Sequence, residues 1–210
     1  MKAIVNVDSN WGIGYNNQLL CSFSEDLSHF KDLTIGKAIV YGRKTLLSFP
    51  DNKPLQNRTN IVISSSKSNI PEIAKKSCDY YCYIKNRNLR GKSIALTGIT
   101  FNKKTDTPSN YLRTTLALVN NIDLVEDVGM FLGHPSDDII VCGGESIYKQ
   151  LLDKCTMVYV TKNSYVNIVK KPDTYFPNLD NLDGWKILSQ DDEKISLSGI
   201  KYKFLVYGRI

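Results

Sequence analysis

A buried-type strand meets two glycines and the start of a helix in the stretch IIVCGGESIY at residues 139–148. A β-branched run that ends at glycine and continues in helix-forming residues is typical of a strand–turn–helix unit. Glycine lets the backbone of the turn approach a ligand closely, and the first amides of the helix can bind a phosphate. The spacing differs from the G-x-G-x-x-G dinucleotide motif. The stretch therefore predicts either a tight turn alone or a phosphate-binding turn of another family.

Strand and helix signals alternate on both sides of this stretch. Such alternation requires crossover connections, which favour a mainly parallel central sheet, and the last two strands can add an antiparallel edge. We therefore predict an α/β fold, a single domain over residues 1–210 with a central mainly parallel twisted sheet, flanking helices and an antiparallel C-terminal edge. The predicted strands cover 3–7, 38–41, 59–64, 138–142, 157–161, 185–189 and 202–207, the predicted helices cover 25–33, 43–49 and 145–152, and 10–14 is predicted as a loop.

The composition is that of a globular protein, with 42% hydrophobic and 23% charged residues among 210. It excludes a disordered tail, a collagen-like fibre and a coiled coil. No apolar run approaches the roughly 20 residues that span a bilayer. The start MKAIVNVDSN places an Asp directly after a short apolar run, which is not the pattern of a signal peptide. We expect a soluble cytoplasmic protein with no membrane partner.

The cysteines and histidines argue against metal and hydrolase chemistry. The only histidines are His29 and His134, so a His-based triad would have to use one of these two, and no serine stands in a G-x-S-x-G elbow. The cysteine spacing matches no zinc pattern. We predict buried free thiols and no metal site. The five cysteines are Cys21, Cys78, Cys82, Cys142 and Cys155.

The excess positive charge lies in one internal segment, residues 67–113, which holds 10 Lys and Arg against 3 Asp and Glu. The rest of the chain holds 17 against 18. The segment offers too few apolar residues for a core of its own, so we interpret it as a basic insertion and not as a second domain. Within and after it we predict a helix over 70–76, paired strands over 80–84 and 93–97, a polar loop over 102–109, a strand over 114–119 and a helix over 121–132.

A second candidate phosphate site is Gly42-Arg43-Lys44-Thr45, which directly follows a predicted strand. Two cations and a hydroxyl suit a phosphate with more than one charge. Cations are disfavoured at the start of a helix unless an anion binds there, which makes a merely solvated basic turn the weaker interpretation. Two phosphate-binding turns after strands suggest a dinucleotide that lies across the ends of the sheet strands.

A candidate acid, Asp26, lies in the first turn of the predicted helix over 25–33. It shares a helix face with Phe30, four residues on, so its carboxylate lies among apolar side chains. An early Asp is usually a helix cap, but Glu25 can serve that purpose and leave Asp26 to point inward. A carboxylate buried in this way needs a hydrogen-bonding or cationic partner, or its pKa rises.

The sequence resembles the dihydrofolate reductase family over nearly its whole length outside the basic insertion, because seven stretches that match that family occur in the right order. The matching stretches are Trp11-Gly12-Ile13-Gly14 with Asn17, Glu25-Asp26-Leu27 with Phe30-Lys31 and Thr34, Gly42-Arg43-Lys44-Thr45 with Ser48, Pro54-Leu55 with Arg58 and 60–64, 143–148, 158–161 and 173–177.

The resemblance implies an enzyme that reduces 7,8-dihydrofolate to tetrahydrofolate with NADPH, by hydride transfer to pterin C6 and protonation at N5. It implies that Asp26, supported by the hydroxyl of Thr161, is the catalytic acid that binds pterin N3 and the 2-amino group, and that Arg58 binds the glutamate α-carboxylate. An Asn in place of Asp26 should keep the shape of the site and lose most of the rate. The remaining substrate-binding residues implied are Val5, Leu27, Phe30, Phe49 and Leu55.

For the cofactor, the resemblance implies that residues around the adenosine 2′-phosphate favour NADPH over NADH and that the double glycine binds the pyrophosphate. It also implies that the loop 11–20 closes over the nicotinamide. The cofactor-binding residues implied are Asn6, Ile13, Gly14, Gly42, Arg43, Lys44, Thr45, Ser64, Ser65, Cys142, Gly143, Gly144, Glu145, Ser146, Ile147 and Tyr148.

Four residues depart from the family pattern. Asn6 replaces a small Ala beside the nicotinamide, Cys21 replaces a loop Trp, Ser24 replaces a Pro, and Cys142 replaces a β-branched residue. None removes the acid, the arginine or the phosphate turns, so we expect activity, with differences in the affinity of antifolate inhibitors.

Two other functions stay open from the sequence: a pyrimidine reductase of riboflavin synthesis with the same fold, and a non-catalytic relative that binds nucleic acid through the basic insertion. The first does not explain Asp26 together with Arg58. The insertion could also attract polyglutamylated folate, although a solvated surface segment is the favoured interpretation. We expect a monomer, because nothing in the sequence indicates an interface.

Overall fold

The computed structural model describes residues 1–64, 80–85, 95–97, 135–164 and 171–210. The chain divides into two compact units. The first unit contains Met1–Leu33 and Val141–Ile210, and the second contains Thr34–Ile140. The two units are described separately below.

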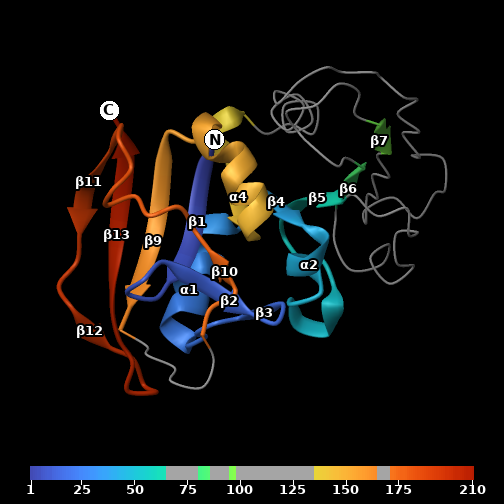
Figure 1. The fold of residues 1–210 in the computed structure, drawn as a ribbon. Helices are drawn as coiled ribbons and strands as arrows, with labels where there is room; N and C mark the ends of the chain where they lie inside the picture. The colour runs from blue at the N-terminus through green and yellow to red at the C-terminus, as the bar shows by residue number, and fades with distance from the viewer. Residues whose placement is uncertain (65–79, 86–94, 98–134, 165–170) are drawn as a thin grey trace. The chain divides into compact units, whose positions relative to one another are not determined.

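The first unit is built on a sheet of mixed direction, labelled in Figure 1. Strand β1 (Lys2–Val7) pairs parallel with β9 (Met157–Asn163), and β13 (Lys201–Arg209) pairs antiparallel with β9. Strand β11 (Trp185–Gln190) and the short β12 (Lys194–Ile195) pair antiparallel with β13. Apolar side chains of β1 and β9, such as Val7 and Val158, are fully buried, as their β-branched runs predicted. The predicted antiparallel C-terminal edge is confirmed.

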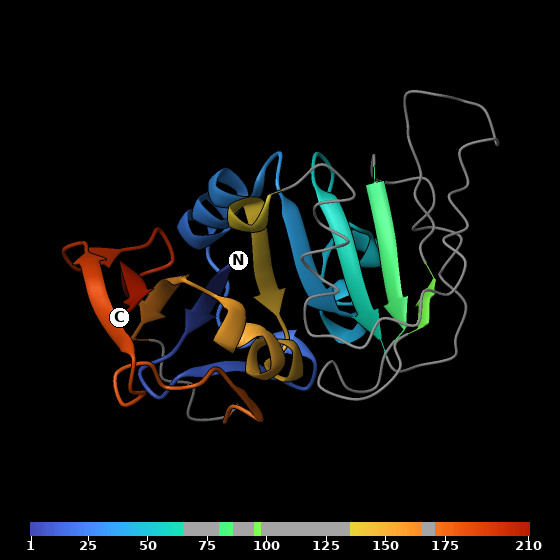
Figure 2. The ribbon, with the colours of Figure 1, turned by 90° about the horizontal axis from the view of Figure 1, so that it is seen from above.

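The described part of the first unit contains the helices α1 (Ser24–Thr34) and α4 (Glu145–Leu151), which lie on opposite faces of the β1–β9 pair (Figure 2). Helix α4 directly follows β8 (Ile139–Gly143), the strand within which the two units meet along the sequence, and is itself followed by the 3-10 turn η5 (Leu152–Lys154). The predicted strand–turn–helix unit is therefore confirmed.

The prediction that residues 10–14 form a loop is wrong. Strand β2 (Gly12–Tyr15) pairs antiparallel with β3 (Gln18–Leu19) and with β10 (Thr174–Tyr175). The glycines of β2 make room for this pairing: a Cβ added to Gly12 would lie 2.4 Å from Cγ of Pro172. The sequence analysis assigned these glycines to a loop, whereas in a strand they permit close approach of a neighbouring segment.

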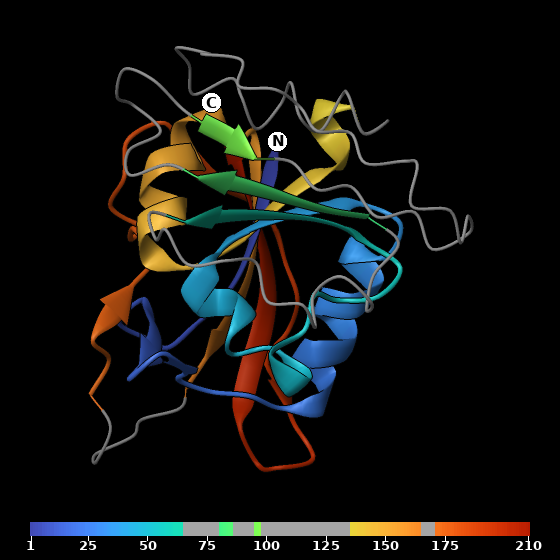
Figure 3. The ribbon, with the colours of Figure 1, turned by 90° about the vertical axis from the view of Figure 1, so that its right-hand side faces the viewer.

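The second unit contains β4 (Ala38–Gly42), β5 (Thr59–Ser64), β6 (Tyr80–Lys85) and β7 (Ala95–Thr97). Strand β4 pairs parallel with β5, β5 pairs parallel with β6, and β6 pairs antiparallel with β7. Figure 3 shows β5, β6 and β7 side by side, coloured from teal to light green. The predicted pairing of the segments 80–84 and 93–97 is confirmed for the part that the structure describes.

Helix α2 (Arg43–Leu46) of the second unit is shorter than the predicted 43–49. Phe49 has extended backbone angles, φ −75° and ψ 158°, because the following Pro50 disfavours a helical residue before it. Pro50 instead opens the 3-10 turn η1 (Pro50–Asn52), and a second 3-10 turn, η4 (Ser136–Asp138), precedes β8.

The sheet strands β1 and β9, β4 and β5, and β5 and β6 pair in parallel, helices are packed with them, and the strands at the C-terminal edge are antiparallel. This arrangement confirms the predicted α/β class. The predicted helices over 70–76 and 121–132, the loop over 102–109 and the strand over 114–119 lie outside the described residues. The single domain with a basic insertion at 67–113 stays a prediction. Among the described residues, no helix has the length and apolar character needed to cross a membrane.

Candidate active site

The carboxylate of Asp26 is the buried acid of the first unit. Asp26 lies in the first turn of α1 and is 9% exposed. Its Oδ2 accepts a hydrogen bond from Nδ2 of Asn6 at 2.8 Å, and the hydroxyl of Thr161 donates a second one. The neighbouring Glu25 points elsewhere, since its Oε1 accepts the backbone N–H of Leu197 at 2.8 Å. The prediction that Asp26 points inward is confirmed.

Burial sets the protonation of this acid. Desolvation raises the pKa of Asp26 above its usual range, and the hydrogen bonds from Thr161 and Asn6, with the charge of His29, offset only part of that rise. The protein therefore stabilises the charged form through two donors and destabilises it through loss of water. A ligand that brings further N–H donors to the carboxylate would favour the charged form.

Two more titratable side chains lie near Asp26. Cys21 is 6% exposed, and burial together with the charge of Asp26 raises the pKa of its thiol to about 11. His29 stacks on Phe204, with ring centroids 3.9 Å apart, and burial lowers its pKa against the opposing attraction of Asp26, Asp191 and Asp32. At neutral pH the Cys21 thiol is therefore protonated and uncharged. The predicted burial of the cysteines is confirmed for Cys21 and Cys155 and is wrong for Cys142, which is half-buried; Cys78 lies outside the described residues.

Asn6 is joined to the acid through its side chain, a contact that the sequence analysis did not predict. Its Oδ1 accepts a hydrogen bond from Nδ2 of Asn163 at 2.6 Å, and Asn163 also donates to the carbonyl oxygen of Val7 at 2.9 Å. Asn163 was missed altogether. A signal for it existed, because it stands two positions after Thr161 on β9, and alternate residues of a strand face the same side.

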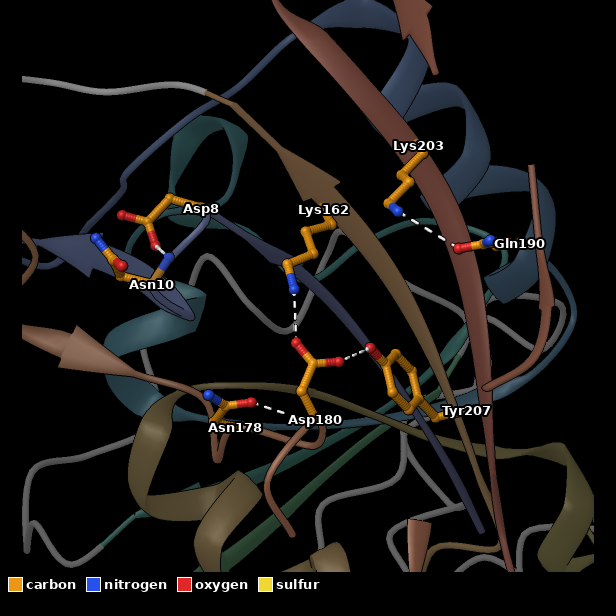
Figure 4. Close-up of polar contacts among 8 residues, drawn as sticks. All are labelled: Asp8, Asn10, Lys162, Asn178, Asp180, Gln190, Lys203 and Tyr207. Atoms are coloured by element: carbon orange, nitrogen blue, oxygen red, sulfur yellow. Dashed lines mark hydrogen bonds and ion pairs between the residues drawn. The ribbon is translucent and has the colours of Figure 1, made fainter. Parts of the chain in front are cut away.

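A second carboxylate of the first unit, that of Asp180, accepts hydrogen bonds from three side chains, and Figure 4 shows two of them, Lys162 and Tyr207. Asp180 accepts from Nζ of Lys162 at 2.7 Å and from the hydroxyl of Tyr207 at 2.6 Å, and the indole of Trp11 donates to it as well. Lys162 also lies 5.1 Å from the centre of the Trp11 ring. This cluster anchors the segment that begins at Trp11, the segment expected to close over the cofactor. Sequence reasoning assigned no role to Asp180.

The same segment is braced from its N-terminal side. Oδ1 of Asp8 accepts the backbone N–H groups of Asn10, at 2.8 Å (Figure 4), and of Gly12, at 2.7 Å. Trp11, between them, has a φ of 65°, in the left-handed region that most residues avoid, and is only 2% exposed. Ring contacts to Phe176 and Tyr207 hold it there.

The double glycine forms the junction of β8 and α4: Gly143 ends β8, and Gly144 directly precedes α4. The Gly143–Gly144 peptide is cis, and Gly143 has a φ of 131°, which a side chain would not tolerate. The hydroxyl of Tyr148, on α4, donates to the carbonyl oxygen of Ile4 at 2.6 Å, and burial raises its pKa. Ile147 is buried too, while Glu145 pairs with Lys149 at 2.7 Å.

In the second unit, Arg58 is held by its own surroundings. Its Nε donates to Oγ1 of Thr34 at 2.8 Å and its Nη1 to the carbonyl oxygen of Gln56 at 2.7 Å. The backbone on either side is fixed by Asn60, which is fully buried and donates from Nδ2 to the carbonyl oxygens of Leu55 and Arg58. The sequence predicts Asn60 only as part of a strand, so its role in shaping this loop was missed.

The other predicted site residues divide between the two units. In the first unit Val5 is buried, Phe30 is half-buried, Leu27 is 50% exposed, and Ile13 and Gly14 lie on β2. The hydroxyl of Ser24, the first residue of α1, donates to Glu25, and Cys142 is half-buried. In the second unit Phe49 packs edge-on against Tyr41, Gly42 ends β4, Thr45 is half-buried, and Arg43 and Lys44 are exposed at the start of α2. Ser64 ends β5, and Ser65 lies outside the described residues.

A family model described as dihydrofolate reductase matches residues 1–98 and 107–209. The chain belongs to the dihydrofolate reductase family. It is therefore an enzyme, an oxidoreductase that uses a nicotinamide cofactor. The match to the dihydrofolate reductase family runs through most of the basic segment and leaves out only 99–106 of it.

Individual dihydrofolate reductases resemble the chain at moderate identity over most of their length. The dihydrofolate reductase of Schistosoma mansoni is 26% identical over 222 aligned residues, covering 99% of this chain and 95% of that protein. The dihydrofolate reductase of Neisseria meningitidis is 27% identical, with 95% and 92% covered, and that of Staphylococcus aureus is 26% identical, with 93% and 88% covered.

Proposed function

We propose that the chain reduces 7,8-dihydrofolate to 5,6,7,8-tetrahydrofolate with NADPH as the reductant. The observation that carries the proposal is the buried Asp26 carboxylate, held by two donors, in a chain of the dihydrofolate reductase family. Asp26 and Thr161 are the residues we assign to catalysis. Val5, Leu27 and Phe30 of the first unit and Phe49, Leu55 and Arg58 of the second are those we assign to substrate binding.

The lone pairs of Asp26 suit a ligand with two parallel N–H donors. A carboxylate offers about four lone-pair positions on its two oxygens. Asn6 and Thr161 each donate to it, which leaves positions for the N3–H and the 2-amino group of a pterin. Charge-assisted hydrogen bonds of this kind are about twice as strong as neutral ones, so the acid both binds the ring and orients it.

The hydride that reaches pterin C6 is the chemistry that the bound cofactor supplies. The proton that must reach N5 needs another source. Cys21, the nearby thiol, has a pKa of about 11 and neither gives nor takes a proton readily at neutral pH. We assign the delivery to a water molecule, with Asp26 polarising the ring and Trp11–Leu20 excluding bulk water, so that Asp26 itself does not touch N5.

The residues present fit a dinucleotide with an extra phosphate. Exposed Arg43 and Lys44 follow directly on β4 and suit the adenosine 2′-phosphate, which favours NADPH over NADH. Gly143, with its φ of 131°, lets the backbone come close to the pyrophosphate. We assign the cofactor further contacts with Asn6, Ile13, Gly14, Gly42, Thr45, Ser64, Ser65, Cys142, Gly144, Glu145, Ser146, Ile147 and Tyr148.

Arg58 is the residue we assign to the glutamate α-carboxylate of the substrate, because a planar guanidinium binds a carboxylate through two parallel N–H groups.

We further propose that the protein is a cytoplasmic monomer with a single domain. It binds antifolate inhibitors at the same site as the substrate and does not bind nucleic acid. A mobility-shift assay with DNA and RNA at physiological salt tests the last point.

The assay for the proposed function is the loss of NADPH absorbance at 340 nm with dihydrofolate as substrate. We expect turnover with dihydrofolate, faster with NADPH than with NADH, and none with the pyrimidine substrate of the riboflavin pathway. Turnover with that pyrimidine alone, or binding of NADPH with no turnover of either substrate, would contradict the proposal.

A further inference from the structure

A series of hydrogen bonds connects the backbone carbonyl of Val7, through the side chains of Asn163 and Asn6, to the proposed catalytic acid Asp26. Asn163 is buried, with 3% of its surface exposed, and its Nδ2 donates to the carbonyl oxygen of Val7 at 2.9 Å and to Oδ1 of Asn6 at 2.6 Å. Asn6 in turn donates from Nδ2 to Oδ2 of Asp26 at 2.8 Å. The four groups therefore form one directed sequence of hydrogen bonds.

The direction of this sequence follows from the carbonyl at its start. A backbone carbonyl can only accept, whereas an amide side chain has one donor end and one acceptor end. The Val7 carbonyl therefore requires the Nδ2 end of Asn163, since a reversed amide would set two acceptors against each other. Asn163 then donates to Oδ1 of Asn6, so Asn6 must present Nδ2 to Asp26. The position of the Val7 carbonyl on β1 therefore determines that Asp26 faces the Nδ2 donor of Asn6 and not its Oδ1 acceptor.

We infer that Asn6, held in this orientation by Asn163, is a positioning residue that fixes the Asp26 carboxylate and stabilises its charged form. The inference rests on the proposed function, in which the charged acid accepts two N–H groups of the pterin. A reversed Asn6 would turn Oδ1 toward the carboxylate and repel it. Asn163 therefore acts on the acid through Asn6, without contact to the substrate.

Three other titratable groups in the described part of the first unit interact electrostatically with Asp26. His29 lies one turn further along α1, Cys21 lies before that helix, and Tyr148 lies on α4. Burial raises the pKa values of Cys21 and Tyr148, so both are uncharged at neutral pH. Only His29 has an ordinary pKa near neutrality, which makes His29→Gln the control that separates its influence from that of Asn6.

The test is a pH titration of the Asp26 carboxyl in the free protein by carbon-13 NMR, with Asp26→Asn to assign the signal. Loss of one hydrogen bond to the carboxylate in Asn6→Ala should raise the proton affinity of Asp26 about tenfold to a hundredfold. Asn163→Ala should raise it less. The double variant should match Asn6→Ala alone, because Asn163 acts through Asn6. The same order should appear in the pH dependence of kcat/KM.

An unchanged titration in Asn6→Ala, or a double variant whose effect is the sum of the single effects, would overturn the inference. If Asn6→Ala does not fold, Asn163→Ala carries the test, since it leaves the direct contact in place. The titration needs no turnover, so an inactive wild type would refute the proposed function while the NMR result still decides the positioning. Normal turnover with unmoved titrations would refute the positioning alone.

Discussion

Replacing Tyr207 by Phe tests the cluster that anchors the segment at Trp11. Tyr207 is 1% exposed and its hydroxyl donates to Asp180 at 2.6 Å. A hydrogen bond to a charged group contributes about 1.5–3 kcal/mol. The Asp180 side chain is 39% exposed, so water can replace part of the lost bond, and we expect the low end, about 1.5 kcal/mol. For a protein of this size that is a fall in Tm of about 3–6 °C.

The pH dependence of this loss has a definite sign. Burial acts to raise the pKa of Asp180, but the hydrogen bonds from Lys162 and Tyr207 outweigh it and lower the pKa. A carboxylate with a lowered pKa stabilises the folded state above its unfolded pKa of about 3.9 and loses that contribution as the pH falls through the folded value. The deficit of Tyr207→Phe should therefore be largest at neutral pH and should shrink below about pH 4.

Urea denaturation at pH 7 and in acid measures this deficit directly. The matched control is Tyr175→Phe, because Tyr175 is 41% exposed and its hydroxyl donates only to the carbonyl oxygen of Pro172, at 2.9 Å. We expect the control to change the free energy of unfolding by less than about 0.5 kcal/mol. Equal losses in the two variants, or a deficit that grows in acid, would refute the role of the Asp180 cluster.

Three further predictions follow from other residues. Arg58→Lys should raise the KM for dihydrofolate about tenfold and leave kcat nearly unchanged, because an ammonium cannot bind a carboxylate through two parallel bonds; a lower kcat at unchanged KM would contradict this. Asp26→Asn should gain stability relative to the wild type as the pH rises from 4 to 8 in urea denaturation. The raised folded pKa of Asp26 stabilises the folded wild type fully below the unfolded pKa of about 3.9, and this contribution is lost as the pH rises through the folded pKa. Cys21, with a pKa of about 11 and 6% exposure, should react with iodoacetamide at pH 8 only after unfolding, as measured by peptide mass spectrometry; rapid labelling of the folded protein would contradict its burial.

Much of the fold could be predicted because it depends on signals that are local in sequence. The β-branched runs at β5 and β9 and the run before the double glycine each specify a buried strand without reference to the rest of the chain. The acid at position 26 was predictable for the same reason, since helical spacing alone places it beside Phe30. Strand β2 was not predictable, because its glycines matter through contacts with Pro172 and Thr174, far away in sequence.

The polar contacts of the site were the least predictable part. Asn60 has no sequence feature that distinguishes it from a surface asparagine, and the only signal for Asn163 is its place two residues after Thr161 on one strand. The roles of both residues depend on which carbonyls and amides the fold brings within hydrogen-bonding distance. Asn6 was recognised as a departure from the family but was expected to face the cofactor, a prediction that stays open beside its observed bond to Asp26. Hydrogen bonds between donors and acceptors that are far apart in the sequence depend on the tertiary structure, so composition and residue spacing do not predict them.

The central claim is that rapid hydride transfer requires the carboxylate of Asp26 and does not require the carboxylate of the neighbouring Glu25. Single-turnover hydride transfer, followed as the loss of NADPH absorbance with dihydrofolate, should be compared in wild type, Asp26→Asn and Glu25→Gln. Glu25 is the matched control, because it is a carboxylate in the same turn whose bond goes to the backbone of Leu197. The account predicts a loss of at least about a hundredfold in Asp26→Asn and a rate within about twofold of the wild type in Glu25→Gln. Rapid transfer in Asp26→Asn, or an equal loss in both variants, would contradict it.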